Sequence, residues 1–284
     1  MKFGANTFIW ADKWSRDLFP LLERLKEAGF DGIEIPLINP DQLEDPELRR
    51  VLERNGLECT VCSVLPEGLN TISNDAEIRR QTREHLKSCV KTTAEIGGSI
   101  MAGPLYAPVG FLPGHRRTND EWRYAVECFQ ELGSTLEENG VTLALEPLNR
   151  YETYFLNTAE DAAKLCKEIN HPQVGILFDT YHANIEEKSI PEAIGQAAPY
   201  LQHFHSCEND RGTPGTGHID WHSVFQALRT ANYNGWLTIE SFGFSLGALS
   251  SAASVWRDLA PKAEDIAFNG LRYLRQMSST AAPS

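Results

Sequence analysis

Four residues that can ligate a metal ion stand at the ends of four apolar segments in the second half of the chain. Each closes a segment such as Leu-Ala-Leu or Leu-Thr-Ile, and the four are Glu146, Asp179, His205 and Glu240. A charged residue that closes an apolar segment is costly to bury unless it is paired or bound to a metal. Each carboxylate alone could instead cap a following helix or pair with a neighbouring Arg or Lys. All four in succession, with an imidazole among them, favour a shared metal site.

The types of these side chains indicate the metal. Three carboxylates and one imidazole form a hard, oxygen-rich ligand set, which suits Mn2+, Mg2+ or Co2+ better than a thiolate-rich zinc site would. Three further polar residues, Glu152, His182 and Arg211, lie six, three and six residues after the nearest preceding candidate ligand. We expect them on loops above the metal, where they would contact a polar substrate. A solvated loop charge is the alternative interpretation of Arg211.

Other residues near predicted strand ends could complete the pocket. His203 precedes His205 by two positions, so the two rings point the same way on a regular strand, whereas a bend would turn one of them away. We expect His205 to ligate the metal and His203 to support the site from behind. Four aromatic residues could line the pocket and face the C–H groups of a sugar: Phe8, Trp14, Tyr106 and Phe242. Packing in the core explains each of them equally well.

The segments that carry these residues alternate between short apolar runs and longer amphipathic stretches along the whole chain. The predicted strands are 3–9, 32–37, 58–65, 99–106, 141–148, 174–178, 201–205 and 236–242. The predicted helices are 18–28, 46–55, 76–96, 119–139, 159–169, 190–198, 221–231 and 252–276.

Eight strands alternating with eight helices predict parallel pairing through right-handed crossovers. Because no glycine-rich phosphate loop follows the first strand, we expect an α/β fold of the closed (β/α)8 barrel (TIM barrel) type. The active site of such a barrel lies at the carboxyl ends of the strands. Intervals of 33, 26 and 35 residues between the four candidate ligands match single strand–helix units. We expect one domain over 1–284, mobile loops at 109–117 and 209–217, and a frayed tail at 278–284.

The composition excludes some classes of function. The chain has 284 residues with a formal net charge of −13, and this acidic field would repel nucleic acid. No apolar run approaches the roughly 20 residues of a membrane span, and no signal-peptide pattern opens the chain. We therefore expect no nucleic-acid or membrane partner and a cytoplasmic location. The six cysteines then predict free thiols, and Cys59 and Cys62, which lack a second pair, are interpreted as part of a buried strand.

Four segments resemble motifs of the ketose 3-epimerases, the family of D-tagatose 3-epimerase, D-psicose (D-allulose) 3-epimerase and L-ribulose 3-epimerase. They are LEPLNRYE (145–152), FDTYHANIEE (178–187), HFHSCENDRG (203–212) and IESFG (239–243). The resemblance runs over nearly the whole chain and keeps the family's spacing. It is weakest at 59–70, 104–117 and 244–246, neighbourhoods that in the family shape the pocket around the distal carbons of the sugar.

The resemblance implies a barrel of the xylose-isomerase-like superfamily that binds a divalent metal, usually Mn2+. It implies that the metal ligands are Glu146, Asp179, His205 and Glu240. It also implies substrate contacts from Glu152, His182 and Arg211, and a small-molecule ketose as the partner. We further expect a homo-oligomer, either a dimer or a tetramer.

The implied reaction is epimerisation at C3 of a free ketose such as D-tagatose, D-fructose or L-ribulose. A metal that acts as a Lewis acid would make the C3 proton acidic and stabilise a cis-enediolate. We assign Glu146 and Glu240, which stand three strands apart on the eight-strand ring, as the paired general acid/base. A hydroxypyruvate-type isomerase or an inosose dehydratase would use the same metal centre. An endonuclease-IV-type enzyme would need three zinc ions and a basic rim, and a non-catalytic sugar-binding barrel is the non-enzyme alternative.

Overall fold

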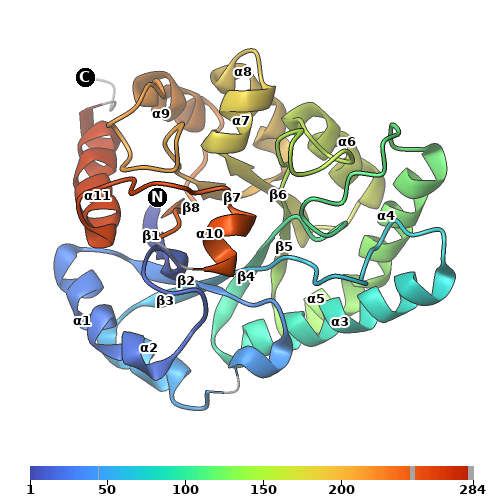
Figure 1. The fold of residues 1–284 in the computed structure, drawn as a ribbon, viewed down its shortest axis with the longest axis horizontal. Coiled ribbons are helices and arrows are strands. Elements are labelled where there is room, and N and C mark those ends of the chain that lie inside the picture. The colour runs from blue at the N-terminus through green and yellow to red at the C-terminus, as the bar shows by residue number, and fades with distance from the viewer. Residues whose placement is uncertain (44, 244–246, 281–284) are drawn as a thin grey trace.

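The computed structural model describes residues 1–43, 45–243 and 247–280. Eight strands pair in sequence order, all in parallel, and the last returns to the first, so the sheet closes into a barrel (Figure 1). The strands are β1 (Lys2–Asn6), β2 (Gly32–Pro36), β3 (Glu58–Cys62), β4 (Gly98–Gly103), β5 (Thr142–Leu145), β6 (Val174–Asp179), β7 (Leu201–His205) and β8 (Trp236–Ile239). The predicted single-domain (β/α)8 barrel is confirmed.

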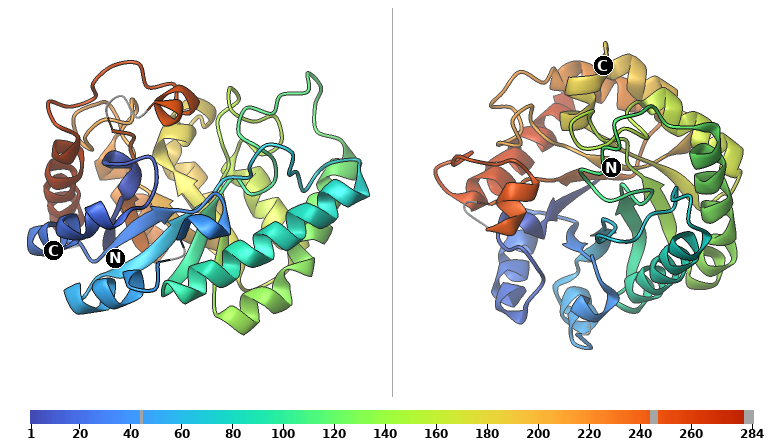
Figure 2. Two further views of the ribbon diagram at one scale, coloured as in Figure 1. Left: turned by 60° about the horizontal axis from the view of Figure 1, so that its bottom comes forward. Right: turned by 45° about the vertical axis from the view of Figure 1, so that its right-hand side comes forward.

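Helices surround the barrel and connect its strands (Figure 2). They are α1 (Phe19–Ala28), α2 (Leu48–Asn55), α3 (Ala76–Glu95), α4 (Asn119–Glu131), α5 (Gly133–Asn139), α6 (Ala159–Ile169), α7 (Thr180–Glu186), α8 (Ile190–Ala197), α9 (Trp221–Thr230), α10 (Ala248–Ala252) and α11 (Ala263–Thr280). Short 3-10 turns occupy Thr7–Ile9, Arg16–Leu18, Pro40–Leu43 and Ala198–Tyr200. The short helix α10 lies in front of the barrel in the view of Figure 1.

Two groups of side chains meet inside the barrel. The first is apolar and consists of Ile100, Ala102, Ala144, Leu177 and Trp236. Because β8 is not adjacent to β4, β5 or β6 in the sheet, these residues can meet only across the barrel interior. The second group is polar and lies around Glu34 on β2, which is paired in register with Asn6 on β1 and Thr60 on β3. This polar group borders the site described below.

Six of the eight strands are shorter than the sequence pattern predicts. Segment 3–9 is β1 followed by a 3-10 turn, because the side chain of Asn6 accepts the backbone N–H of Phe8 and caps that turn. β8 likewise ends at Ile239, before Glu240. At β1 the capping side chain of Asn6 therefore takes the chain out of the sheet, and at β8 the strand ends directly before the polar Glu240.

Two predicted helices differ in extent from the observed ones. Segment 119–139 is two helices, α4 and α5, which meet at Leu132. Segment 252–276 is wrong in its first half, since the long C-terminal helix begins only at Ala263. Pro261 explains the late start, because proline lacks a backbone N–H and disfavours the helical conformation of the residue before it. The helix continues to Thr280, so residues 278–280 of the predicted frayed tail are helical, and 281–284 lie outside the described residues.

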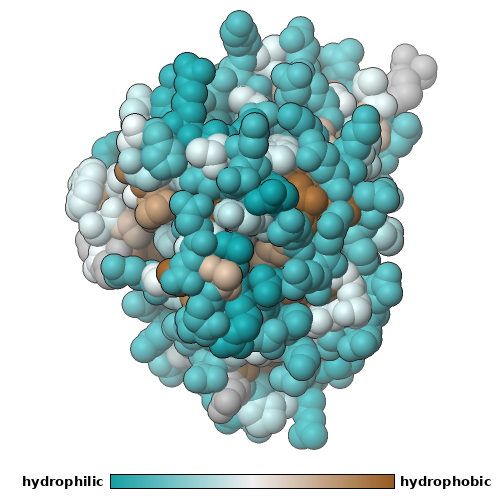
Figure 3. All heavy atoms as spheres, turned by 90° about the vertical axis from the view of Figure 1, so that its right-hand side faces the viewer, coloured by the Kyte–Doolittle hydropathy of each residue, from teal (hydrophilic) through white to brown (hydrophobic). Residues whose placement is uncertain are grey.

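The outer surface over helices α3 to α6 is mainly hydrophilic, with small separate apolar areas (Figure 3). Within the described part of the chain, no helix combines the length and the apolar character that crossing a membrane requires.

The cysteines are all buried and unpaired, as predicted. They are Cys59, Cys62, Cys89, Cys128, Cys166 and Cys207. Burial raises the pKa of Cys89, Cys128 and Cys166 to about 12, so these thiols stay protonated and poorly nucleophilic near neutral pH. Cys59 and Cys62 lie on β3, in agreement with the buried-strand interpretation of this pair.

This burial predicts the outcome of a thiol titration. We expect the folded protein to react with almost no aromatic disulfide reagent at pH 8, and the same sample to show six thiols after unfolding in guanidinium chloride. Rapid modification of two thiols in the folded protein would contradict the buried position of Cys59 and Cys62.

Candidate active site

The structure brings the four candidate metal ligands together at the carboxyl end of the barrel. Each lies at or directly after one of the strands β5 to β8, and one ligand atom of each lies within 4.8 Å of the other three. The four residues are between 1% and 8% exposed; they are Glu146, Asp179, His205 and Glu240. Three carboxylates and an imidazole thus face one another in a region with little access to water.

Asp179 uses its two carboxylate oxygens for different purposes. Oδ1 accepts the backbone N–H of Tyr181 at 2.6 Å and caps α7. Oδ2 faces the cluster, 3.7 Å from Nδ1 of His205. The helix-capping interpretation of this carboxylate is therefore correct, but it leaves the second oxygen available as a ligand.

The donor set fits a divalent cation. Nδ1 of His205 is buried and makes no hydrogen bond to any described residue, yet it points toward carboxylates, 3.4 Å from Oε2 of Glu240. An unpartnered imidazole nitrogen aimed at carboxylate oxygens is what a site for a hard metal ion presents. The residues that would hold such an ion are Glu146, Asp179, His205 and Glu240.

The crowding of carboxylates changes their protonation. Burial, followed by the negative charge of Glu240, raises the pKa of Glu146 well above its usual value. Burial alone would raise the pKa of Asp179 as well, but the guanidinium of Arg211 holds it below its usual value. Burial opposes the charged form of His205, but the carboxylates of Glu34 and Glu240 raise its pKa well above 6.5. The raised pKa values of Glu146 and His205 both reflect the concentration of negative charge in the cluster.

Arg211 lies against these carboxylates rather than out in a loop above them. It is 6% exposed, its Nη1 donates to Oδ2 of Asp179 at 2.8 Å, and it also donates to Oε2 of Glu240. Its guanidinium lies over the ring of Tyr181, with 4.2 Å between the guanidinium carbon and the ring centroid. The solvated-charge interpretation of Arg211 is therefore wrong.

The loop that carries Arg211 is held by a buried carboxylate that the sequence analysis did not single out. Glu208 is fully buried and accepts the backbone N–H groups of Gly215 and Ile219 and the indole N–H of Trp221, at 2.8 to 3.0 Å. Segment 209–217 was predicted to be a mobile loop because of its Gly and Pro content, but these hydrogen bonds tie it to one carboxylate. Arg211 can consequently hold a left-handed backbone conformation, with φ of 65°.

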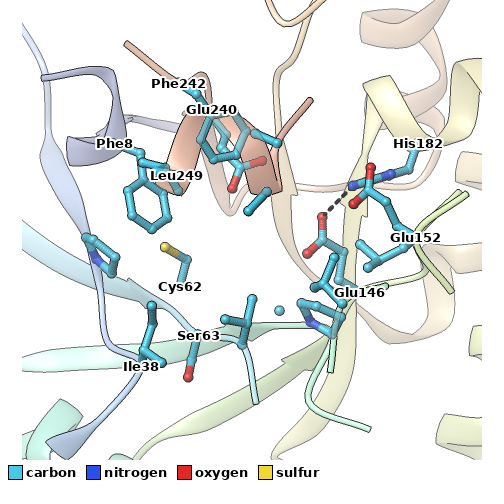
Figure 4. A pocket seen from close by; sticks show the side chains of 18 of the residues that line it. Phe8, Ile38, Cys62, Ser63, Glu146, Glu152, His182, Glu240, Phe242 and Leu249 are labelled. Carbon is cyan, nitrogen blue, oxygen red and sulfur yellow. Dashed lines mark ion pairs between the residues drawn. The ribbon is translucent and has the colours of Figure 1, made fainter. Parts of the chain in front are cut away.

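His182 and Glu152 stand beside the cluster and share a neighbour. Nδ1 of His182 accepts the backbone N–H of Asn149 at 3.1 Å, while the Asn149 side chain donates to Oε1 of Glu152 at 2.7 Å. Burial, with a contribution from Arg211, lowers the pKa of His182 despite the opposing charge of Asp179. Nε2 of the ring lies 3.1 Å from Nη2 of Arg211, a group that can only donate, and 3.5 Å from Oε1 of Glu146 (Figure 4).

A cavity of about 190 Å3 opens onto these groups. Figure 4 shows Glu146, Glu152 and His182 on one side of it and Phe8, Ile38 and Leu249 on the other, and residues of α10 complete the lining. One wall is therefore polar and the opposite wall apolar.

Of the four aromatic residues expected at the pocket, Phe8 and Phe242 line the cavity, with their ring centroids 5.6 Å apart. Trp14 and Tyr106 do not lie among its described lining residues. Trp14 packs against Phe19, and the hydroxyl of the fully buried Tyr106 donates to the backbone carbonyl of Glu146. Both rings are buried and are engaged in these packing and hydrogen-bond contacts.

Both histidines of β7 point into the barrel, so no bend turns one of them away. Nε2 of His203 lies 2.6 Å from Oε2 of Glu34, and Nε2 of His205 lies 2.8 Å from Oε1 of the same carboxylate. His203 is outside the four-ligand cluster, as expected. Glu34 was missed, although it is a charged residue inside the otherwise apolar strand Gly-Ile-Glu-Ile-Pro, and that signal could have identified it.

A closed parallel barrel with acidic and imidazole ligands at the carboxyl ends of its last four strands defines a xylose isomerase-like barrel. The chain belongs to this family, since the model of the xylose isomerase-like TIM barrel matches residues 22–277.

Within that family the chain belongs to the ketose 3-epimerases. It is 38% identical over 280 residues to a Synechocystis protein named "Probable ketose 3-epimerase", covering 99% of this chain and 98% of that protein. It is 33% identical to the D-psicose 3-epimerase of Ruminiclostridium cellulolyticum, covering 93% and 92%. The crystal structure of a D-allulose 3-epimerase from Methylomonas sp. in complex with D-allulose superposes with a TM-score of 0.92 at 30% identity, covering 98% and 97%.

Proposed function

We propose that this chain epimerises free ketoses at C3 with Glu146 and Glu240 as a pair of acid/base groups beside a bound divalent metal. Membership of the ketose 3-epimerases makes it an isomerase that acts on ketoses. The observation that carries the proposed mechanism is the convergence of four buried ligand atoms beside a cavity that both of these glutamates line.

The positions of the two glutamates suit a reaction that inverts one carbon. Glu146 follows β5 and Glu240 follows β8, so the two side chains enter the cavity from different parts of the ring (Figure 4). One carboxylate would remove the C3 proton on one face of the sugar, and the other, in its acid form, would deliver a proton to the opposite face. The raised pKa of Glu146 supports this role, because a carboxyl that protonates more readily can hold a proton as well as release one.

A divalent metal at the site would supply the Lewis acidity that makes the C3 proton removable. The chain's own residues would hold the sugar in place. The ring of His182, held between Asn149 and Arg211, can contact a substrate oxygen. Glu152 can accept from a hydroxyl, and Arg211 can donate to an oxygen that gains negative charge as the proton leaves. All three line the cavity.

We also propose the identity of the metal, the assembly and the location. Mn2+ is the favoured metal, with Co2+ or Mg2+ as alternatives, because three of the four donors are carboxylates. A homodimer or homotetramer would cover apolar side chains such as Phe111 and Leu112, which are 42% and 49% exposed. A cytoplasmic location agrees with six free, buried cysteines.

Metal removal and replacement test this function. After dialysis against a chelator, confirmed by elemental analysis, we expect no epimerisation of any ketose in a panel of free hexuloses and pentuloses. Adding Mn2+ or Co2+ should restore the reaction and, in D2O, incorporate deuterium at C3. Metal should also raise the melting temperature, since a ligand present at 100 times its Kd stabilises the folded state by about 2.7 kcal/mol.

The other outcomes of this experiment identify the alternatives. Full activity in metal-free protein would overturn the proposal. A product that lacks the elements of water would indicate a dehydratase, and exchange at a different carbon would indicate an aldose–ketose type of isomerase. Saturable binding of a ketose without any exchange at C3 would indicate a sugar-binding barrel.

A further inference from the structure

We propose that Glu34 is a positioning residue that fixes the ring of His205 for metal binding, and that His203 holds Glu34 in place for this task. This inference rests on the proposed metal site. It assigns a role to a buried charge on β2 that lies outside the four-ligand cluster.

Glu34 is completely buried, and hydrogen-bond donors surround its carboxylate. Oε1 accepts from Nδ2 of Asn6 at 2.9 Å and from Nε2 of His205 at 2.8 Å. Oε2 accepts from the hydroxyl of Thr60 at 3.0 Å and from Nε2 of His203 at 2.6 Å. Donors that satisfy the oxygens of a buried carboxylate favour its ionised form, and the oxygens of Glu34 have four such partners.

The contact with Glu34 determines which nitrogen of His205 is free. Because a carboxylate can only accept, Nε2 of His205 must carry the proton that it donates. In the neutral ring the lone pair is then on Nδ1, which is the unpartnered atom facing Glu240 and Asp179. An imidazole that ligates a metal commonly donates its other N–H to a carboxylate, which orients the ring and increases its basicity.

His203 explains why the carboxylate keeps this orientation. It lies two residues before His205 on the same strand, and the two ring centroids are 5.2 Å apart. One oxygen of Glu34 is held by each ring, so the carboxylate cannot rotate without breaking both contacts. β7 and β2 lie on different sides of the barrel, and Glu34 therefore connects the ligand-bearing strand to β1, β2 and β3 through the interior.

The same three residues are close enough to form a metal site of their own, but their hydrogen bonds argue against it. Glu34, His203 and His205 present ligand atoms within 4.8 Å of one another. An ion there would have to replace the protons on both Nε2 atoms and compete with Asn6 and Thr60 for the oxygens. The distances of 2.6 and 2.8 Å between the carboxylate oxygens and Nε2 are those of hydrogen bonds.

Glu34→Gln tests the inference, because glutamine keeps the shape of the side chain but places an N–H2 group where a carboxylate oxygen was. If that group faces His205, it must meet a lone pair on Nε2, and the ring proton moves to Nδ1, the atom that would ligate the metal. We expect the Kd for Mn2+, measured by titration calorimetry without substrate, to rise about 10- to 100-fold. In metal-free protein with 15N-labelled histidine, brought to a pH at which the His205 ring is neutral, we expect the chemical shifts of His205 to change to those of the Nδ1–H tautomer.

Thr60→Val is the matched control, since it removes one donor to Glu34 and leaves both imidazole contacts intact. It should bind Mn2+ within about threefold of the parent protein. Glu34→Asp keeps the charge but shortens the reach, and it serves if Glu34→Gln does not fold. That variant should also bind Mn2+ more weakly, while kcat recovers at saturating Mn2+ and the KM for the ketose stays near its original value.

The inference is overturned if Glu34→Gln, or Glu34→Asp in its place, binds Mn2+ as tightly as the parent protein with the His205 tautomer unchanged. It is also overturned if the ketose KM rather than the Mn2+ Kd changes. The Mn2+ Kd and the His205 tautomer are measured without any ketose. If the parent protein bound Mn2+ in this way but failed to epimerise ketoses, the proposed function would fail and this inference would stand.

Discussion

Glu146→Gln and Glu240→Gln are each expected to reduce the rate of epimerisation by at least about 10²- to 10⁴-fold, the usual contribution of a general acid/base group. Glutamine keeps the shape of the side chain and offers an oxygen to the metal, but it cannot accept and return a proton. Each variant retains one working carboxylate, so each should still exchange the C3 proton of one epimer with D2O without inverting it. The two variants should differ in the epimer that they exchange.

Bound Mn2+ must be measured in both variants, because both residues belong to the four-ligand cluster. A loss of activity can be assigned to acid/base catalysis, rather than to metal binding, only in a variant that still binds the metal. If one variant with full metal occupancy epimerised at close to the parental rate, a single base with a reorienting substrate would replace the two-base mechanism.

Arg211→Ala is expected to lower kcat/KM by about 10²- to 10³-fold, in the range found when one donor to a developing oxyanion is removed. The guanidinium lines the cavity and lies within reach of an oxygen bound next to Asp179 and Glu240. Metal content should stay near the parental value, because Arg211 supplies no ligand atom.

Arg211→Lys is the control for charge. It keeps the positive charge and the backbone but loses the planar pair of donors, so it should recover only part of the activity. If the Arg211→Ala variant instead lost metal while its turnover per bound ion stayed unchanged, a substrate contact would be contradicted. Arg211 would then serve to position the metal ligands.

The barrel and the four ligands could be predicted because each has a local signal. Strand and helix periods alternate along the chain, and a polar residue that directly follows an apolar strand lies at the carboxyl end where parallel strands converge. Asp179 illustrates the limit of this argument, since its position also predicts a helix cap, and the structure shows both uses. The position of an aspartate at a strand end does not predict which of its two carboxylate oxygens caps the helix and which faces the metal site.

Features that depend on contacts across the barrel could not be predicted in this way. Glu34 and His203 are 169 residues apart in the sequence, and their contact requires the closed ring. Arg211 is buried on a loop that has the composition of a flexible one but is held by hydrogen bonds to the distant side chain of Glu208. The late start of α11 had a local signal in Pro261, but the apolar residues before it obscured that signal.

The polar interior around Glu34 also constrains how this barrel can evolve. Removing one partner of a buried charge costs about 3–5 kcal/mol, whereas replacing a whole buried ionic group by apolar residues of similar volume is often neutral or stabilising. Substitutions at Asn6, Glu34, Thr60 and His203 should therefore show strong epistasis, with single changes harmful and some combinations harmless. In homologues that have lost the activity, single substitutions toward an apolar interior would still be destabilising. These four residues are therefore expected to remain even where catalysis is no longer selected.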